Sequence, residues 1–175
     1  GEGAAVEDRI DEVLRRDRHG IQATGNTGRR GRVVRAMTVP NVKLNNGTSI
    51  PQLGFGVWQV PDDGARDAVA EALRVGYRSI DTAKVYENEA GTGRAIAESG
   101  LARDEVFLTT KLWNSDQGLD ETLRAFDASL ERLGTNYVDL YLIHWPVPEY
   151  DRFVDTFKAF QQIRDSGRAK AIEIG

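Results

Sequence analysis

Three ionisable side chains stand at the ends of apolar runs that are typical of β-strands: Asp81, Lys111 and His144. The first two lie 30 positions apart and the last two 33. Where strands and helices alternate, the ends of successive strands share one rim, and this rim carries the active site in barrel enzymes. Tyr86 follows Asp81 by five residues and is predicted to lie in the loop above the same rim. The spacing therefore predicts a catalytic cluster.

These four side chains suit the transfer of a proton to a carbonyl oxygen. A tyrosine is a poor proton donor at neutral pH unless a positive charge stabilises its phenolate, and Lys111 can supply that charge. We expect Asp81 to keep the lysine protonated, and His144 to orient the carbonyl and stabilise the negative charge that develops on its oxygen. Because no side chain donates hydride, reduction of the carbonyl would also require a nicotinamide.

Each of these residues has a plainer interpretation. Asp81 and Lys111 can form a structural or solvated ion pair, and Tyr86 can cover the end of a helix. His144 precedes Trp145-Pro146 and can be a hydrogen-bonded histidine at a strand terminus. Since three consecutive strand ends carry ionisable groups, we favour the catalytic interpretation.

Two tryptophans occupy comparable positions. Trp58 and Trp113 each fall at the end of a predicted strand. A tryptophan there belongs either to the core or to the wall of an apolar pocket. Because both would lie beside the ionisable cluster, we favour the pocket.

The elements that must position these residues begin with a predicted β-hairpin. It covers residues 42–53, and its Asn46-Gly47 pair tolerates the positive φ angles of a tight turn. A short first strand is predicted over residues 54–58. Asp62 or Asp63 is expected to cap the helix that follows, and Gly76 to end it.

Strands and helices then alternate to the end of the sequence. The predicted strands cover residues 78–81, 106–111, 138–144 and 169–174, and the predicted helices cover 89–98, 120–133 and 153–165. The strands are apolar runs, as in a parallel sheet that is covered on both faces. Because no GxGxxG motif joins a strand to a helix, the pattern favours a (β/α) barrel over a dinucleotide-binding Rossmann fold.

Composition limits the classes of function. The 175 residues include 27 acidic and 23 basic side chains, a net charge of −4, so no overall positive field attracts nucleic acid or an anionic membrane. The absence of cysteine excludes disulfides, thiolate nucleophiles and Cys-based zinc sites. No apolar run approaches the roughly 18 residues of a membrane span, and the first segment lacks the apolar region of a secretory signal. We expect a soluble, cytoplasmic protein that binds small molecules.

Residues 1–36 differ from the rest. They carry 8 arginines against 6 acids, whereas the remainder carries 15 basic against 21 acidic residues. We expect an atypical, flexible extension over residues 1–36 and a single domain over 37–175. A basic arm can bind an anionic partner, but an irregular tail or wrongly included upstream sequence is the simpler interpretation.

Three segments together resemble the signature sequences of the aldo-keto reductases. They are DTAKVYENE over 81–89, TKLW over 110–113 and DLYLIHWP over 139–146. Their order and spacing also agree with that family, and the similarity runs from about Val39 to Ala171. The stretches 44–58 and 96–113 are most similar to the bacterial 2,5-diketo-gluconate reductase group.

The resemblance implies an α/β fold, the eight-stranded (β/α) barrel, and an activity, the NADPH-dependent reduction of an aldehyde or ketone to an alcohol. It also implies a catalytic tetrad in which Tyr86 is the general acid: Asp81, Tyr86, Lys111 and His144. No metal is expected. The full-length enzyme would be a monomer.

The resemblance further implies which residues contact the ligands. Val57, Trp58 and Asp81 would bind the cofactor near the nicotinamide ribose. The substrate, a small carbonyl compound, would be bound by Trp58, Trp113 and His144.

The sequence departs from the family at its last residues. The family's fifth strand continues as Ile-Gly-Val-Ser-Asn, whereas here Ile172 precedes Glu173, Ile174 and Gly175, so the serine and asparagine that hold the nicotinamide carboxamide are absent. If the face with Glu173 points into the barrel, burial of its charge would be costly.

The chain is expected to be the N-terminal half of such an enzyme. It would hold the hairpin, four βα units and the start of strand five of an incomplete (β/α)8 barrel. A half barrel leaves a strand edge and an apolar face exposed, so we expect it to be inactive alone and to self-associate. The alternative is a non-catalytic, truncated family member that acts as an interaction or regulatory module through residues 1–36.

Overall fold

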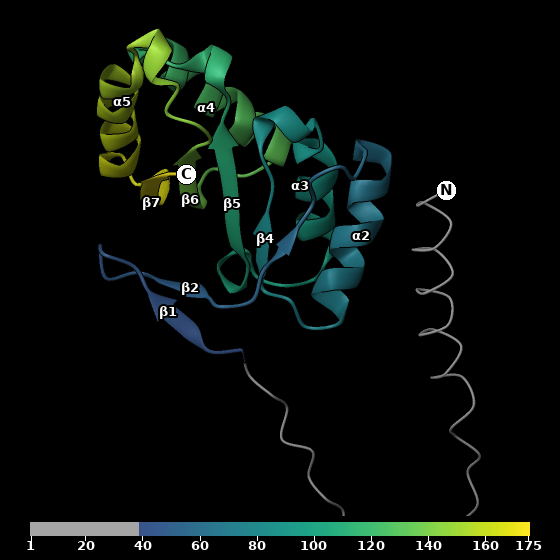
Figure 1. Ribbon diagram of the computed structural model, residues 1–175. Helices are drawn as coiled ribbons and strands as arrows, with labels where there is room; N and C mark the ends of the chain where they lie inside the picture. Colours follow the sequence, from purple (N-terminus) through teal and green to yellow (C-terminus); the bar gives the residue numbers. More distant parts are fainter. Residues whose placement is uncertain (1–38) are drawn as a thin grey trace, which may run out of the picture. The chain divides into compact units, whose positions relative to one another are not determined.

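The computed structural model describes residues 39–175 (Figure 1). The predicted extension over residues 1–36 lies outside the described residues. The described part opens with an antiparallel hairpin of β1 (Asn41–Lys43) and β2 (Ser49–Pro51), which confirms the hairpin predicted around Asn46-Gly47.

Five further strands form one sheet in chain order, and every neighbouring pair is parallel. The strands are β3 (Phe55–Gly56), β4 (Ser79–Asp81), β5 (Phe107–Leu112), β6 (Val138–Ile143) and β7 (Ala169–Ile174). One helix crosses over between each pair: α2 (Asp62–Arg74), α3 (Glu89–Glu98), α4 (Leu119–Leu133) and α5 (Phe153–Asp165). Short 3-10 turns complete the connections: η2 (Lys84–Tyr86), η3 (Arg103–Glu105), η4 (Asn114–Asp116) and η5 (Pro148–Tyr150). This order confirms the predicted incomplete (β/α) barrel.

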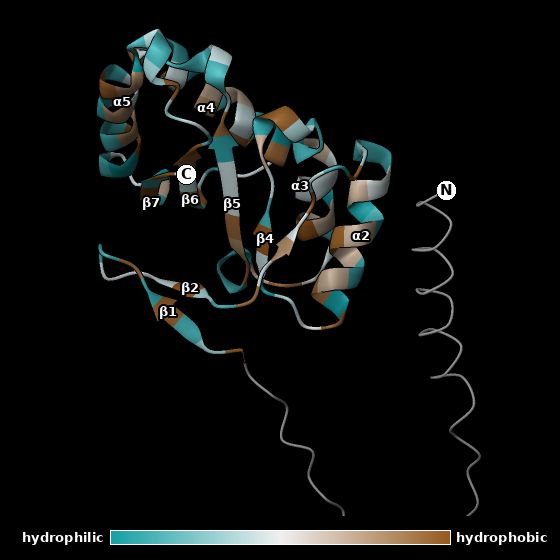
Figure 2. Cartoon of the chain, viewed as in Figure 1, coloured by the Kyte–Doolittle hydropathy of each residue, from teal (hydrophilic) through white to brown (hydrophobic). Residues whose placement is uncertain are grey.

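The core lies between the sheet and these helices. Tyr141 on β6 is fully buried, and its ring lies 4.4 Å from that of Phe160 on α5 and 4.6 Å from that of Phe126 on α4. Hydrophobic and hydrophilic residues alternate along the helices (Figure 2), so each helix is amphipathic and turns its apolar side to the sheet. Among the described residues, helices cover only this face of the sheet, whereas the sequence predicted cover on both.

Two ionisable side chains of the strands, Lys111 and Glu173, lie on the opposite face of the sheet, as the strand register shows. Lys111 pairs with Leu142, and Leu142 pairs with Glu173. Paired residues of parallel strands share a face, so these three side chains lie on the same side of the sheet. Tyr141 and Ile143 alternate with them and point to the helices.

Strand ends differ slightly from the prediction. The first strand shortens to Phe55–Gly56, because the chain turns at Gln59, where φ is 64°. Lys111 is followed by one more strand residue, Leu112, and His144 lies just after β6. All three predicted strand ends nevertheless remain at one rim.

The predicted cap of the first helix is wrong. Pro61 is the residue at the N-terminal end of α2, and Asp62 and Asp63 both lie inside the helix without capping it. Asp62 instead caps the next helix, because its Oδ1 accepts a 2.6 Å hydrogen bond from the amide of Gly91 in the first turn of α3. The predicted end at Gly76 is confirmed, since φ of this residue is 108°.

Residues 39–175 hold neither a membrane-spanning helix nor a cluster of metal ligands. None of these helices is long and apolar enough to cross a membrane. The same residues contain no group of three or more His, Asp or Glu side chains that could hold a metal ion.

Candidate active site

A tight ion pair joins the ends of β4 and β5. Lys111 Nζ donates to both carboxylate oxygens of Asp81 at 2.7 Å, and to the carbonyl oxygen of Thr82 at 3.0 Å. The lysine side chain is only 12% exposed, whereas the Asp81 side chain is 39% exposed. Three oxygen acceptors therefore hold the ammonium group in one place, beside a carboxylate that solvent can reach.

Tyr86 and His144 stand next to this pair. The ammonium nitrogen of Lys111 lies 5.1 Å from the centroid of the Tyr86 ring. The imidazole of His144 meets that ring edge to face, with 5.7 Å between the centroids. The structure thus brings all four predicted catalytic residues together, although they come from three separate segments of the chain.

The environment of His144 favours a neutral imidazole. Burial lowers the pKa of His144 below its usual value of 6.5, and the positive charge of Lys111 lowers it further, while the carboxylate of Asp81 opposes both effects. Nδ1 of His144 is buried and has no hydrogen-bond partner. At neutral pH this side chain can therefore orient a carbonyl but carries no full positive charge.

An open pocket of about 530 Å³ begins at these rings. It is lined by Trp58, Gln59, Val85, Tyr86, Trp113, His144 and Trp145. Every tryptophan of the chain contributes to this wall, and no Asp, Glu, Lys or Arg does. The pocket therefore favours an apolar or aromatic compound whose polar group reaches Tyr86 and His144.

The three residues predicted to contact a cofactor lie together at the edge of this pocket. The amide of Val57 donates to the carbonyl oxygen of Asp81 at 3.1 Å. Val57 itself is fully buried, whereas Trp58 is 68% exposed. An accessible aromatic ring in the pocket wall and an accessible carboxylate bound to Lys111 fit the binding of a cofactor here.

Glu173 lies on the same face of the sheet as Lys111. Its side chain is exposed, so the cost of a buried charge does not arise among the described residues. The register therefore settles the face that the sequence left open, and Glu173 shares the face of Lys111.

Some residues of the site were missed by the sequence interpretation. Trp145 was noted only as the neighbour of His144, yet it stacks beside it in the pocket wall. Gln59 lies in a turn and Val85 in the short η2, where no periodic pattern marks an inward side chain. Asn88, a fully buried residue behind the pocket, belongs to the quoted signature but received no role.

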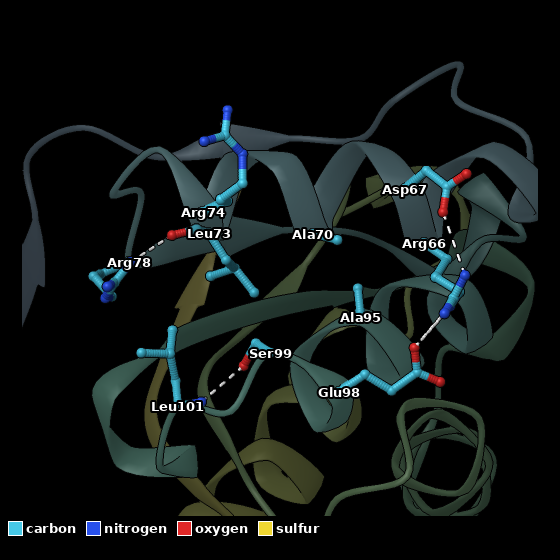
Figure 3. A pocket seen from close by; sticks show the side chains of 10 residues that line it. All are labelled: Arg66, Asp67, Ala70, Leu73, Arg74, Arg78, Ala95, Glu98, Ser99 and Leu101. Atoms are coloured by element: carbon cyan, nitrogen blue, oxygen red, sulfur yellow. Dashed lines mark hydrogen bonds and ion pairs between the residues drawn. The ribbon is translucent and has the colours of Figure 1, made fainter.

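A second pocket, of about 490 Å³, lies between α2 and α3, away from this rim (Figure 3). The arginine side chains of this pocket are already hydrogen-bonded to other groups of the protein. Arg66 donates to Glu98 at 2.6 and 2.8 Å, and Arg78 donates to the carbonyl oxygen of Leu73 at 2.9 Å. We therefore place the candidate active site at the tryptophan-lined pocket.

Comparison with known proteins agrees with this geometry. The model of the aldo/keto reductase family matches residues 46–175. An aldo-keto reductase of Mycolicibacterium smegmatis is 63% identical over 135 residues, which are 77% of this chain and 49% of the relative. The glyoxal reductase of Bacillus subtilis is 49% identical over 134 residues, 76% of this chain and 48% of the relative.

Solved structures give the same result. A variant of the protein Gox0644, in complex with NADPH, superposes with a TM-score of 0.74 at 43% identity, over 79% of this chain and 49% of that one. The chain thus spans about half the length of the curated relatives it matches. The family model covers well over half of the chain, and the candidate active site brings together residues of all three signature segments. This chain belongs to the aldo/keto reductase family.

Proposed function

We propose that this chain carries the catalytic rim of an NADPH-dependent carbonyl reductase, in which Tyr86 protonates the oxygen of an aldehyde or ketone. The observation that supports this role most directly is the position of Lys111. Its ammonium group is held by Asp81 and Thr82 and lies 5.1 Å from the Tyr86 ring. A fixed positive charge beside a phenol stabilises the negative charge that the phenol acquires when it gives up its proton.

Each of the four side chains has its own role in the proposed reaction. Asp81 keeps the lysine charged, and Lys111 stabilises the phenolate. His144, as a neutral imidazole, holds the substrate carbonyl oxygen near the Tyr86 hydroxyl. When NADPH is bound it supplies the hydride, which the carbonyl carbon accepts. The Tyr86 hydroxyl then gives its proton to the oxygen, an alcohol is formed, and the phenolate regains a proton from solvent.

The ligand contacts follow from accessibility. Trp58 and Asp81 would hold the nicotinamide end of NADPH, since both side chains are accessible and Asp81 is bound to Lys111. Val57 would lie near the nicotinamide ribose. Trp58, Trp113 and His144 would hold the substrate, and the absence of charged side chains from the wall favours neutral, apolar carbonyl compounds.

Two measurements on the purified protein test the proposal. NADPH should quench the tryptophan fluorescence, because all three tryptophans line the pocket. Tyr86→Phe removes only the hydroxyl, so it should leave this quenching intact. In a full-length enzyme that carries these residues, it should lower turnover of an aldehyde by about 10²- to 10⁴-fold, the usual contribution of a general acid. Turnover that survives in Tyr86→Phe would exclude Tyr86 as the acid, and a lack of quenching in the wild type would exclude the cofactor site.

A further inference from the structure

A buried asparagine connects two loops of the candidate active site. Asn88 Nδ2 donates to the carbonyl oxygens of Val57 at 2.8 Å and Val60 at 2.7 Å. Its Oδ1 accepts a 2.7 Å hydrogen bond from the hydroxyl of Thr82. Asn88 and Thr82 are both fully buried. One side-chain amide therefore links the loop after β3 to the loop after β4.

This use of Asn88 is unusual for its position in the chain. Asn88 is the residue that precedes the first turn of α3, where an asparagine ordinarily caps the helix with its side chain. Here it makes no such hydrogen bond. Asp62 caps α3 in its place, through the amide of Gly91. The side chain of Asn88 is thereby available for the two loops.

Both loops carry groups of the candidate active site. Val57 and Val60 flank Trp58, whose ring forms part of the pocket wall. Thr82 offers its carbonyl oxygen to Lys111 Nζ at 3.0 Å. The contacts of Asn88 therefore lie one residue from the substrate wall on one side, and one hydrogen bond from the catalytic ammonium group on the other.

We propose that Asn88 is a positioning residue, which fixes Trp58 relative to Lys111 and so sets the geometry between the pocket wall and the acid. This inference rests on the proposed function. Because Asn88 and Thr82 are fully buried and all four groups of the network are hydrogen-bonded, the network has one preferred arrangement. Loss of the amide would leave two carbonyl oxygens without their donors and release the loop that carries Trp58.

Asn88→Ser is the informative variant. Serine starts a helix about as well as asparagine, but its side chain is too short to reach both loops. If Asn88 served only to begin α3, this change would be neutral. Asp62→Ala is the matched control, because it removes the hydrogen bond that does cap α3 and touches no group of the pocket. Urea unfolding of both variants shows how much stability each change costs.

One readout is independent of activity. Fluorine NMR of protein labelled with 5-fluorotryptophan gives one signal for each of the three tryptophans, and Trp58→Phe identifies the signal of Trp58. We expect Asn88→Ser to shift or broaden the Trp58 signal and to leave that of Trp145 in place. Asp62→Ala should leave both signals in place, even if it lowers stability as much.

The second readout is kinetic. In a full-length enzyme that carries these residues, we expect Asn88→Ser to lower kcat for an aldehyde by about tenfold or more, because a displacement of about one ångström at a catalytic group has an effect of at least this size. Asp62→Ala should keep the wild-type kcat. Equal effects of the two variants on the Trp58 signal would overturn the proposal, as would a wild-type spectrum for Asn88→Ser. If the wild type does not bind NADPH, the proposed function fails, and the fluorine spectra still decide the role of Asn88.

Discussion

The buried side chain of Glu89 can be used to test how the sheet beneath the candidate active site is stabilised. Its side chain is only 1% exposed and connects α3 to two other elements. It accepts hydrogen bonds from the Thr110 hydroxyl on β5 at 2.6 Å and from Nε of Arg132 on α4 at 2.8 Å. Since Thr110 precedes Lys111, we expect Glu89→Ala to destabilise the rim from behind.

The size of the effect follows from the two partners. Removing one member of a buried ion pair costs about 3–5 kcal/mol in general. Arg132 is 40% exposed and can turn to solvent, which places the cost at the lower end. Thr110 is fully buried, and its hydroxyl would lose an acceptor at about 1–3 kcal/mol. We expect Glu89→Ala to lower the free energy of unfolding by about 3 kcal/mol. Glu89→Gln keeps an acceptor for Thr110, so it should cost about half as much.

Urea unfolding, followed by circular dichroism, measures these differences. Glu98→Gln is the control, because Glu98 lies on the same helix and also binds an arginine, Arg66, but is 54% exposed. We expect its unfolding midpoint to equal that of the wild type, since surface ion pairs contribute little. A loss below about 1 kcal/mol for Glu89→Ala, or equal losses for the alanine and glutamine variants, would refute this account of the buried carboxylate.

Two further predictions concern single positions. Because burial lowers the pKa of His144, the unfolded chain takes up a proton at higher pH than the folded one. The stability due to His144 is therefore complete above about pH 6.5 and falls as the pH drops through the folded pKa, which an NMR titration of folded and urea-unfolded protein checks. An equal or higher pKa in the folded state would contradict this. A Cβ on Gly93 would overlap the carbonyl oxygen of Leu133, so Gly93→Ala should destabilise the α3–α4 contact by about 1–3 kcal/mol. Gly64→Ala, whose Cβ meets its nearest atoms at 3.7 Å within α2, should instead stabilise by about 0.5–1 kcal/mol in the same melts.

Local patterns in the sequence were sufficient to predict the order of the elements. Apolar runs mark β4 to β7, and glycines with positive φ end the helices, as at Gly76 and Gly134. The bounds of α3 and α5 agree with the predicted ranges. Three rim residues were also found from spacing, because parallel strands bring their ends to one side whatever the details of the helices between them.

Contacts between distant segments could not be predicted in this way. Asp62 looked like the cap of its own helix, since nothing local shows that Gly91 lies within reach of it. Asn88 looked like the start of a helix, and its contacts with Val57 and Val60 depend on how two loops pack together. Trp145 entered the pocket through the path of the chain after β6, which no periodic pattern encodes.

The hydrogen bond from Gly91 to Asp62 joins two helices whose ends would otherwise be separate. The first turn of α3 is complete only while α2 is folded, because α2 contributes the acceptor. Arg94 strengthens this dependence by donating to the other oxygen of Asp62 at 2.9 Å. Local opening of α2 therefore exposes the first amides of α3 as well, so the two helices should exchange their amide protons as one cooperative unit.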